Sequence, residues 1–400
     1  MCSMFRGKKR NGSLMILAFI MLINAMSSGI IIPLLYPYSS KFGINPLGLG
    51  LLFASYAFFQ FLSTPIIGRL ADRFGRKPLL LMSIFGSFLS LALFASAQTA
   101  FVLFLARSLD GITGGNISVA QAMIADTTEG KDRVKGFGIL GAMSGLGFLI
   151  GPALGGFMSN ISLTAPFWFA SFLAFLATIL GAIILKETLA DKTVSKQKSE
   201  PLFNFKAIAL ALLSPTIGSV LLLTFISYFA HHAVMIAFQT YTVDELKLNS
   251  QTIGIIFTFI GLVVVFVRSI GLQFVIDRVK SNRKIIKFSL LVSSISMLLI
   301  PLFPSLKVFI ILIFIYVAMY SLIHPVLTSL ISKSVNEEDQ GVALGINQSY
   351  ASLGQVLGPV SAGFISQFSI KLIFPWASSF LFVGFLLSYY MKGALKKANL

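Results

Sequence analysis

Long apolar segments recur along the whole chain, and they constrain its fold more than any other feature. Each is close to the roughly 20 residues that a helix needs to cross the hydrocarbon core of a membrane. The twelve segments run over 14–37, 47–67, 78–97, 100–125, 136–158, 165–186, 214–240, 251–275, 285–304, 308–332, 341–366 and 371–391. Only 11% of the 400 residues are charged, whereas soluble domains carry about 25%. The pattern therefore predicts an all-α integral membrane protein with twelve transmembrane helices.

The basic residues follow the topology of such a protein. The formal net charge of +17 could suggest a nucleic-acid partner. However, most basic residues fall in alternate loops and near both ends, and the other loops hold only Lys41, Lys247, Lys307 and Lys371. Because basic loops stay on the cytoplasmic side, we expect both termini in the cytoplasm, a lipid bilayer around the spans and no nucleic-acid partner. The expected localisation is the plasma membrane, which is the inner membrane in a bacterium.

An internal repeat divides the chain into two halves. Gly147, Gly151, Pro152 and Gly156 recur as Gly354, Gly358, Pro359 and Gly363, each 207 positions later. We therefore expect an N-terminal six-helix bundle over 1–186, a cytoplasmic linker over 187–206 and a C-terminal six-helix bundle over 207–400. Two parallel repeats of six spans, with a site near the middle of the membrane, are the plan of a secondary transporter.

Three motifs resemble those of a known transporter family. The run GRLADRFGRK, from Gly68 to Lys77, is similar to the cytoplasmic signature of the major facilitator superfamily. Arg107 with Gly111, and the stretch from Gly147 to Gly156, are similar to two further motifs of its twelve-span drug:proton antiporter branch, especially the tetracycline efflux pumps. The resemblance implies two pseudo-symmetric bundles, alternating access, and a proton gradient as the energy source with no cofactor.

The first motif predicts a conformational latch. Its residues are Gly68, Asp72, Arg73, Arg76 and, from the fourth span, Asp126. Gly68 would let another helix approach the end of the second span, and Asp72 can face the positive amino-terminal end of a neighbouring helix. The resemblance implies that Asp72, Arg76 and Asp126 join the two halves in the outward-facing state. A basic loop that only fixes topology is the alternative.

Asp110 is the one carboxylate that we expect near the middle of the membrane. It lies about 15 Å of helix below Ala100, where the fourth span begins on the outer side. Arg107 is three residues earlier, on the same helical face. Charges at that depth are costly and usually mark function, and the resemblance implicates the arginine in proton transfer. We assign the pair to proton coupling, and a static ion pair that fixes packing is the alternative.

The glycine-rich fifth span predicts a close helix contact. Small residues at Gly147, Gly151 and Gly155 let two backbones touch, and Pro152 removes a hydrogen bond and bends the helix. The resemblance makes these residues, together with Gly156, the antiporter motif, which packs between the halves and closes the cytoplasmic path against leak. Ordinary close packing is compatible with that role.

Polar groups in other spans are candidates for a substrate cavity. They are Asn24, Asn116, His231, His232, Gln239, Tyr320 and His324. Asn24 stands where the tetracycline pumps have a carboxylate, which argues against tetracycline as a substrate, and an interhelical hydrogen bond is an equal alternative for it. Adjacent helical residues point about 100° apart, so only one of His231 and His232 should face a given cavity. Arg268 should snorkel to the inner membrane interface.

Enzyme signatures are absent from the sequence. It contains no phosphate-binding loop, no metal-spaced cluster of His and Cys, and no nucleophile with a base. We therefore expect a monomeric, proton-driven exporter of small lipophilic molecules that needs no metal. A symporter or uniporter of a small metabolite on the same fold is the first alternative, and a transport-dead receptor or scaffold is the second.

Overall fold

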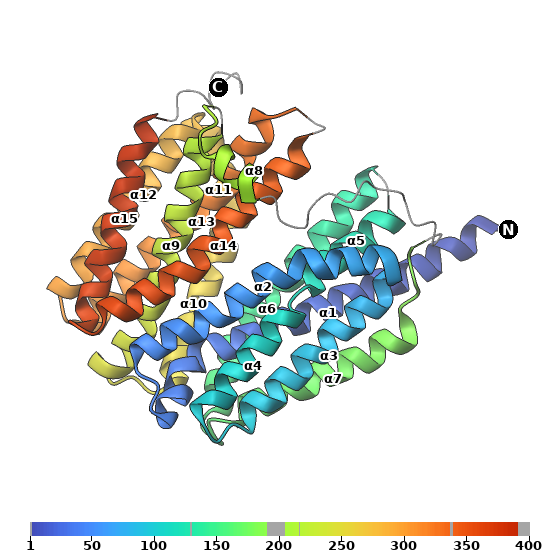
Figure 1. The fold of residues 1–400 in the computed structure, drawn as a ribbon, viewed down its shortest axis with the longest axis horizontal. Helices are drawn as coiled ribbons and strands as arrows, with labels where there is room; N and C mark the ends of the chain where they lie inside the picture. Colours follow the sequence, from blue (N-terminus) through green and yellow to red (C-terminus); the bar gives the residue numbers. More distant parts are fainter. Residues whose placement is uncertain (1, 129, 190–204, 216, 337–338, 391–400) are drawn as a thin grey trace. The chain divides into compact units, whose positions relative to one another are not determined.

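The computed structural model describes residues 2–128, 130–189, 205–215, 217–336 and 339–390 (Figure 1). Within these ranges the regular structure is helical and there is no strand. A backbone inside a membrane must satisfy its own hydrogen bonds, and a helix does so within one segment. Of the linker expected over 187–206, residues 190–204 lie outside the described ranges.

The helices follow the apolar segments, and short 3-10 or π turns are labelled η. The first half forms α1 (Cys2–Ser39), η1 (Ser40–Phe42), α2 (Pro46–Phe74), α3 (Arg76–Ala95), α4 (Ala100–Thr113), α5 (Asn116–Thr127), α6 (Gly130–Met158) and α7 (Ala165–Ile184). The second half forms α8 (Phe205–Ala211), α9 (Gly218–Thr240), η2 (Tyr241–Glu245), α10 (Ser250–Phe266), η3 (Val267–Gly271), α11 (Leu272–Val279), α12 (Asn282–Leu299), η4 (Ile300–Leu302), α13 (Leu306–Ser334), α14 (Gln340–Ile365), η6 (Ile370–Leu372), α15 (Ile373–Leu387) and η7 (Ser388–Tyr390).

The chain divides into two compact units. The first comprises Met1–Gly43, Ser55–Leu202 and Asn249–Thr258, and the second comprises Ile44–Ala54, Phe203–Leu248 and Phe259–Leu400. The first residues of α2 and of α10 thus group with helices from the other half of the sequence. We call the two units the N-terminal unit and the C-terminal unit.

Each unit is built around one buried helix. In the N-terminal unit, α6 and α7 pack on α1, and α7 also packs on α3 (Figure 1). In the C-terminal unit, α14 and α15 pack on α9, and α12 packs on α13 and α15. The span that contains α1 is 61% buried, and the span that contains α9 is 67% buried, the two highest values among the candidate spans. These two helices occupy corresponding places in the two halves of the sequence.

Repeated glycines make corresponding helix contacts in the two units. A Cβ atom added to Gly151 of α6 would lie 2.5 Å from the carbonyl oxygen of Met26 in α1. A Cβ atom on Gly354 of α14 would lie 2.7 Å from the amide nitrogen of Phe229 in α9, and one on Gly358 would meet the Phe229 carbonyl. In both units the glycines therefore let two backbones approach more closely than any side chain would allow.

The expected single helix over residues 100–125 is wrong, because α4 ends at Thr113 and α5 begins at Asn116. The amide of Gly115 donates to the carbonyl of Thr113, with a nitrogen-to-oxygen distance of 2.9 Å, and the Ser83 hydroxyl donates to the same carbonyl. A Cβ atom on Gly115 would lie 2.6 Å from Cγ2 of Ile67, so the turn needs glycine. The backbone leaves the helix here because side-chain and turn hydrogen bonds replace the helical ones.

Ten helices in the described part of the chain are long and apolar enough to cross a membrane. The other two expected spans are the broken segment and α14. The helices α4 and α5 have only 14 and 12 residues. The helix α14 has 26 residues but carries polar side chains such as Asn347 and Gln348. Broken or polar helices in membranes occur where they are buried in protein or line a cavity. These two spans are therefore candidate positions for a functional site.

Candidate functional site

Arg107 and Asp110 form an ion pair inside the N-terminal unit. The Arg107 Nη1 group donates to Asp110 Oδ2 over 3.1 Å, and the two side chains are 8% and 17% exposed. The guanidinium also lies 4.2 Å above the ring centroid of Tyr56. Arg107 Nε is buried and has no hydrogen-bond partner among the residues that the structure describes. The guanidinium is therefore held by one carboxylate and one aromatic face, which leaves part of its hydrogen-bonding capacity unused.

Three serines of α3 align α4 beside them. Ser90 donates to the carbonyl of Ala106 over 2.9 Å, and Ser87 donates to Asp110 Oδ1 over 3.4 Å. Ser83 donates to the carbonyl at the end of α4. The three serines recur at helical spacing, so they lie on one face of α3. This spacing is a sequence signal for an interhelical contact that the motif analysis did not use.

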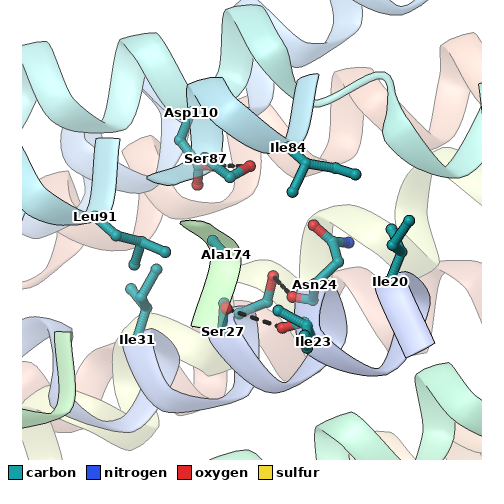
Figure 2. Close-up of a pocket in the computed structure, with 11 residues that line it drawn as sticks. Ile20, Ile23, Asn24, Ser27, Ile31, Ile84, Ser87, Leu91, Asp110 and Ala174 are labelled. Atoms are coloured by element: carbon teal, nitrogen blue, oxygen red, sulfur yellow. Dashed lines mark hydrogen bonds between the residues drawn. The ribbon is translucent and has the colours of Figure 1, made fainter. Parts of the chain in front are cut away.

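A small cavity opens on the Asp110 side of this pair (Figure 2). Its aliphatic lining comes from α1, α3 and α7 and consists of Ile20, Ile23, Ile31, Ile84, Leu91 and Ala174. Its polar lining is Asn24, Ser27, Ser28, Ser87 and Asp110. In Figure 2, Asp110 and Ser87 lie on one side of the cavity, and Asn24 lies on the other. A serine hydroxyl can donate a hydrogen bond to a carboxylate and can accept one from a protonated carboxyl group. The cavity therefore offers Asp110 a hydrogen-bond partner in either protonation state.

Asn24 makes an interhelical hydrogen bond and also lines this small cavity. Its Oδ1 atom accepts a hydrogen bond from Asn116 Nδ2 over 2.6 Å, which joins α1 to the first residue of α5. Asn24 also lines the cavity (Figure 2). Asn116 itself is 3% exposed. The break between α4 and α5 therefore places an asparagine at a helix start, where it bonds the buried helix α1.

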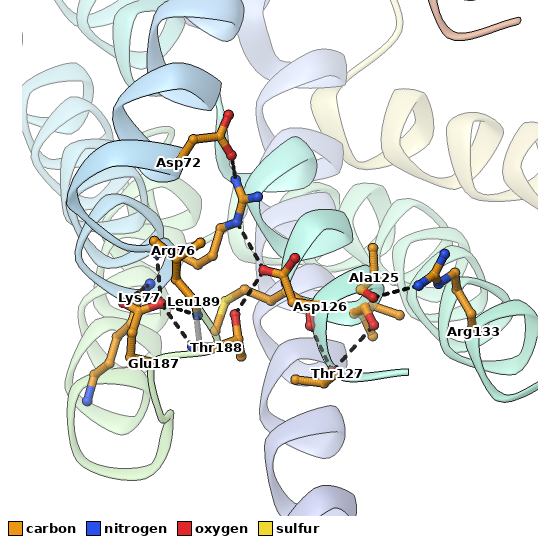
Figure 3. A network of polar contacts seen from close by, with 12 residues as sticks. Asp72, Arg76, Lys77, Ala125, Asp126, Thr127, Arg133, Glu187, Thr188 and Leu189 are labelled. Carbon is orange, nitrogen blue, oxygen red and sulfur yellow. Dashed lines mark hydrogen bonds and ion pairs between the residues drawn. The ribbon is translucent and has the colours of Figure 1, made fainter. Parts of the chain in front are cut away.

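Three of the expected latch residues, Asp72, Arg76 and Asp126, lie in a polar network where α2 and α5 end and α3 begins (Figure 3). Arg76 lies between two carboxylates: Nη1 is 2.5 Å from Asp72 Oδ1, and Nε is 3.1 Å from Asp126 Oδ2. Arg73 is not in this pairing and lies over the ring of Phe74. A Cβ atom on Gly68 would meet no described atom within 4 Å.

Glu187, which the sequence analysis did not single out, completes the network. Its Oε1 and Oε2 atoms accept hydrogen bonds from the backbone amides of Arg76 and Lys77 over 2.9 and 3.1 Å (Figure 3). These amides open α3, so a residue that follows α7 caps the start of another helix. Gly75, at φ +110°, precedes them, and a Cβ atom there would collide with the Glu187 carboxylate. No local pattern announces such a cap, because its two partners are more than 100 residues apart.

The electrostatics of Glu187 follow from these contacts. Burial by itself would raise the pKa of its carboxyl, but backbone N–H donors from Leu189, Arg76, Thr188 and Lys77 together hold the pKa below its ordinary value. Thr188 also donates to Asp126 Oδ2 over 3.3 Å, which ties the segment after α7 to the Arg76 pairing.

Six rings form a second polar cluster, which lies entirely within the C-terminal unit. They are Tyr228, His231 and His232 of α9 and Tyr316, Tyr320 and His324 of α13, and we call them the ring cluster. His231 stacks on Tyr320 with ring centroids 4.0 Å apart and an interplanar angle of 8°. Its Nδ1 atom is 3.0 Å from the Tyr316 hydroxyl. The cluster thus contains all three histidines of the chain.

His231 and His232 both belong to this cluster, although adjacent helical residues point about 100° apart. His232 Nδ1 donates to the carbonyl of Tyr228 over 2.9 Å, and its ring stacks on the Tyr228 ring. The two histidine rings also meet edge to face, with centroids 5.4 Å apart. Rings that point about 100° apart can still touch when tyrosines fill the space around them. Gln239 is fully buried, about 12 Å further along α9.

The antiporter-motif residues pack mainly against α1. Gly147 would place a Cβ atom 2.5 Å from the carbonyl of Leu22, and Gly155 would place one 3.2 Å from the carbonyl of Ile30. Pro152 lies inside α6 and borders Gly29 of α1. A Cβ atom on Gly156 would instead lie 3.2 Å from the Cα atom of Gly254, in the part of α10 that belongs to the same unit. No group of three or more His, Cys, Asp or Glu residues that could hold a metal ion occurs among the described residues.

Two helical units of transmembrane segments, each built around a buried helix and containing a polar cluster at depth, define a membrane transporter. The family model of the Major Facilitator Superfamily matches residues 17–281 and 220–394, and the chain belongs to this superfamily. The fold class and family expected from the sequence are therefore confirmed.

Two relatives and one solved structure extend this comparison. The chain is 30% identical over 361 residues to the tetracycline resistance protein, class E, of Escherichia coli, a match that covers 89% of this chain and 88% of that protein. It is 28% identical over 364 residues to the quinolone resistance protein NorA of Staphylococcus aureus, covering 90% and 92%. A crystal structure of a bacterial homologue of the human lysosomal transporter Spinster, inward-facing and unoccupied, aligns with a TM-score of 0.80 at 17% identity, covering 97% and 98%.

Proposed function

We propose that this transporter exports small lipophilic or drug-like molecules in exchange for protons. The observation that carries the proposal is the Arg107–Asp110 pair, whose carboxylate faces a cavity inside the N-terminal unit. The two relatives named for tetracycline and quinolone resistance support a drug-like substrate class. Such exchange requires that proton binding and substrate binding each change the affinity of the protein for the other.

Asp110 is the group to which we assign the proton. As a carboxylate, it attracts the Arg107 guanidinium and accepts hydrogen bonds from Arg107 and Ser87. As a neutral acid it keeps a hydrogen bond but loses the charge that holds Arg107, which then has the Tyr56 ring as its remaining partner. The two protonation states of Asp110 therefore favour different positions of the guanidinium. A substrate that binds better to one of them would displace the proton, which is the coupling that antiport requires.

The break between α4 and α5 can serve as a hinge when the protonation of Asp110 changes the position of Arg107. Asp110 lies one turn before Gly114, and Asn116 begins the next helix on the other side of the turn. A change in the Arg107–Asp110 pair can thus tilt α4 while α5 stays bonded to α1 through Asn24. Few residues need to change their backbone angles in such a hinge.

The other motif residues receive supporting roles in the same proposal. Asp72, Arg76 and Asp126 form the latch. In the structure Arg76 pairs with both acids inside the N-terminal unit, where it joins α2, α3 and α5. The glycines of α6 seal the protein against leak by their backbone contacts with α1. The ring cluster contributes to the substrate path. We further propose a monomer in the bacterial plasma membrane, with both termini in the cytoplasm, powered by the proton gradient without a cofactor or an enzymatic step.

Transport in proteoliposomes tests the proposal. Purified protein is reconstituted, a pH gradient is imposed in either direction, and a panel of lipophilic fluorescent compounds of positive, neutral and negative charge is followed. We expect a proton gradient to drive at least one compound in the direction opposite to proton flow. Flux in the same direction as the protons would instead identify a symporter, and flux that ignores the gradient would identify a uniporter.

Asp110→Asn is the decisive variant. It keeps the size of the side chain and removes its titration, so we expect it to abolish gradient-driven efflux and to retain downhill exchange of the same compound. The matched control is Asp277→Asn, at an exposed carboxylate of α11 that bonds only Gln273 of the same helix among the contacts described. Unchanged coupling in Asp110→Asn would remove Asp110 from the mechanism.

A further inference from the structure

The cavity beside Asp110 has room for water. Its volume, counted as the space open to the centre of a water molecule, is about 20 Å³, and one bound water needs about 10–15 Å³ in the same sense. A wholly apolar cavity of this size would stay dry. This cavity instead contains a carboxylate, an asparagine side chain and serine hydroxyls (Figure 2). A buried water makes roughly two to four hydrogen bonds, and such a lining can supply them.

Asn24 presents an unused amide group to the cavity. Its side chain points from α1 into the cavity in Figure 2. Its Oδ1 atom accepts a hydrogen bond from Asn116, whereas its Nδ2 group has no hydrogen-bond partner among the residues that the structure describes. The amide oxygen has two lone pairs, and Asn116 uses only one of them. Asn24 can therefore donate a hydrogen bond to a water molecule and can also accept one from it.

The serines and the carboxylate leave acceptor positions for the same water. The Ser27 and Ser28 hydroxyls each donate to the helix carbonyl four residues earlier, over 2.9 and 3.2 Å. Each hydroxyl has one hydrogen, so only its oxygen lone pairs remain for the cavity. Across the cavity, Asp110 Oδ1 accepts from Ser87 over 3.4 Å and has capacity for a further donor. A water between the two sides could donate to Asp110 and to a serine while it accepts from the Asn24 amide.

Water fits this cavity better than a metal cation does. Carboxylate, amide and hydroxyl oxygens also bind small hard cations. However, Arg107 already pairs with the Asp110 carboxylate over 3.1 Å, and Asp110 is the only acid among the described residues that line the cavity. A second cation would therefore be repelled by the guanidinium without gaining a counter-charge of its own. A neutral water molecule does not incur this cost.

We infer that the cavity binds water that joins Asp110 to Asn24, and that Asn24 acts on the proton of Asp110 through this water. As a carboxylate, Asp110 accepts a hydrogen bond from the water. As a neutral acid it donates one, and the water turns to donate to Asn24 Oδ1. Asn24 is thus a positioning residue for the proton, and its bond to Asn116 connects the water to the start of α5. The inference rests on the proposed function only in treating Asp110 as the carrier of the coupled proton.

Infrared difference spectroscopy of the full-length protein in lipid vesicles tests the inference without any substrate. Spectra are recorded over a series of acidic to neutral pH values, in ordinary water and in water labelled with heavy oxygen. A C=O stretching band that Asp110→Asn removes reports the protonated Asp110 carboxyl, and an O–H stretching band that shifts with the oxygen isotope belongs to water. The described charged or titratable groups beside Asp110 are Arg107 and Tyr56, whose side chains ordinarily titrate only at alkaline pH.

We expect a water band that appears or disappears together with the Asp110 carboxyl band in the wild type and is lost in Asp110→Asn. Asn24→Leu keeps the approximate size of the side chain and removes its polar groups. It should lose the water band and keep the carboxyl band, at a higher frequency because a hydrogen bond is missing. Ala174→Val fills part of the cavity with two methyl groups and should also lose the water band, with every polar group in place.

Asn116→Leu is the matched control. It removes the hydrogen bond to Asn24 at a residue outside the cavity lining, so both bands should remain as in the wild type. The inference would be overturned by a wild type without a water band that follows Asp110. An Asn24→Leu or Ala174→Val protein that keeps the band, or an Asn116→Leu protein that loses it as completely as Asn24→Leu, would also overturn it.

These outcomes can be told apart from those that test the proposed function. A wild-type protein that shows the linked water band but no proton-driven flux would support this inference and contradict the proposed function. Proton-driven flux that depends on Asp110, without a linked water band, would do the reverse. A wild type with no carboxyl band that Asp110→Asn removes would contradict both.

Discussion

Gly151→Ala should destabilise the contact between α1 and α6. The added methyl group would lie 2.5 Å from the carbonyl oxygen of Met26 and 3.0 Å from the Cα atom of Gly29. Both neighbours are backbone atoms, so no side-chain rotation can make room for it. Ordinary contacts between such atoms are about 3.5 Å or more, so the two helices must separate by on the order of 1 Å. Overpacking of this kind costs about 1–3 kcal/mol.

Gly141→Ala is the matched control on the same helix. A Cβ atom on Gly141 would meet nothing within 4 Å. Both substitutions replace glycine by alanine in α6, so they share the gain in helix propensity of about 1 kcal/mol. The difference between the two variants therefore isolates the overpacking at Gly151, and it should be about 1–3 kcal/mol.

Thermal unfolding of the two purified variants in detergent micelles measures this difference. Gly151→Ala should unfold at a lower temperature than Gly141→Ala. Gly358→Ala, at the repeated position in α14, should likewise unfold below its own control Gly345→Ala, because Gly358 meets the Phe229 carbonyl and Gly345 has open space. A Gly151→Ala protein as stable as Gly141→Ala would refute the claim that backbone contact holds α6 on α1.

Two further predictions concern the polar contacts. Because backbone donors hold the pKa of Glu187 below its ordinary value of 4.5 despite the opposing effect of burial, its cap stabilises the protein above about pH 4.5. This stability should be lost as the pH falls through the lowered pKa. A melting-temperature series against pH should show the loss in the wild type and not in Glu187→Gln, and identical profiles would contradict the cap. A double-mutant cycle of Asn24→Ala and Asn116→Ala should give a coupling of about 0.6–1.7 kcal/mol, whereas zero coupling would show that their hydrogen bond does not hold α5 to α1.

The helical architecture was predictable because each membrane span is recognisable from its own run of apolar residues. A run of apolar residues near the length of the hydrocarbon core has no alternative to a helix. The repeat was equally visible, since Gly151 and Gly358 occupy matching positions in the sequence and make matching backbone contacts. Arg107 and Asp110 were found as a pair because three residues along one helix bring two side chains together.

The break after Thr113 escaped prediction for a physical reason. Glycine is common in membrane helices, so two adjacent glycines do not by themselves indicate a turn. What ends α4 is a hydroxyl group on another helix, Ser83, which donates to the carbonyl of Thr113. The contact joins segments that are 30 residues apart, and no periodicity within either segment specifies it.

Glu187 and the ring cluster were hidden for a similar reason. Glu187 matters only because the segment after α7 returns to the start of α3. His231 was visible as a polar residue in a span, but its partner Tyr320 is on a helix about 90 residues later. Such sites depend on which helices are neighbours, and that information is absent from hydropathy.

Proton release on substrate binding tests the central claim most directly. Purified protein is placed in weakly buffered detergent solution with a pH-indicating dye, and a compound that the proteoliposome assay has identified as transported is added at several starting pH values. The account predicts that binding releases a proton from the wild-type protein over part of this pH range, and that Asp110→Asn binds the compound without releasing one. Equal proton release from both proteins, or none from the wild type at any pH, would contradict the assignment of the coupled proton to Asp110.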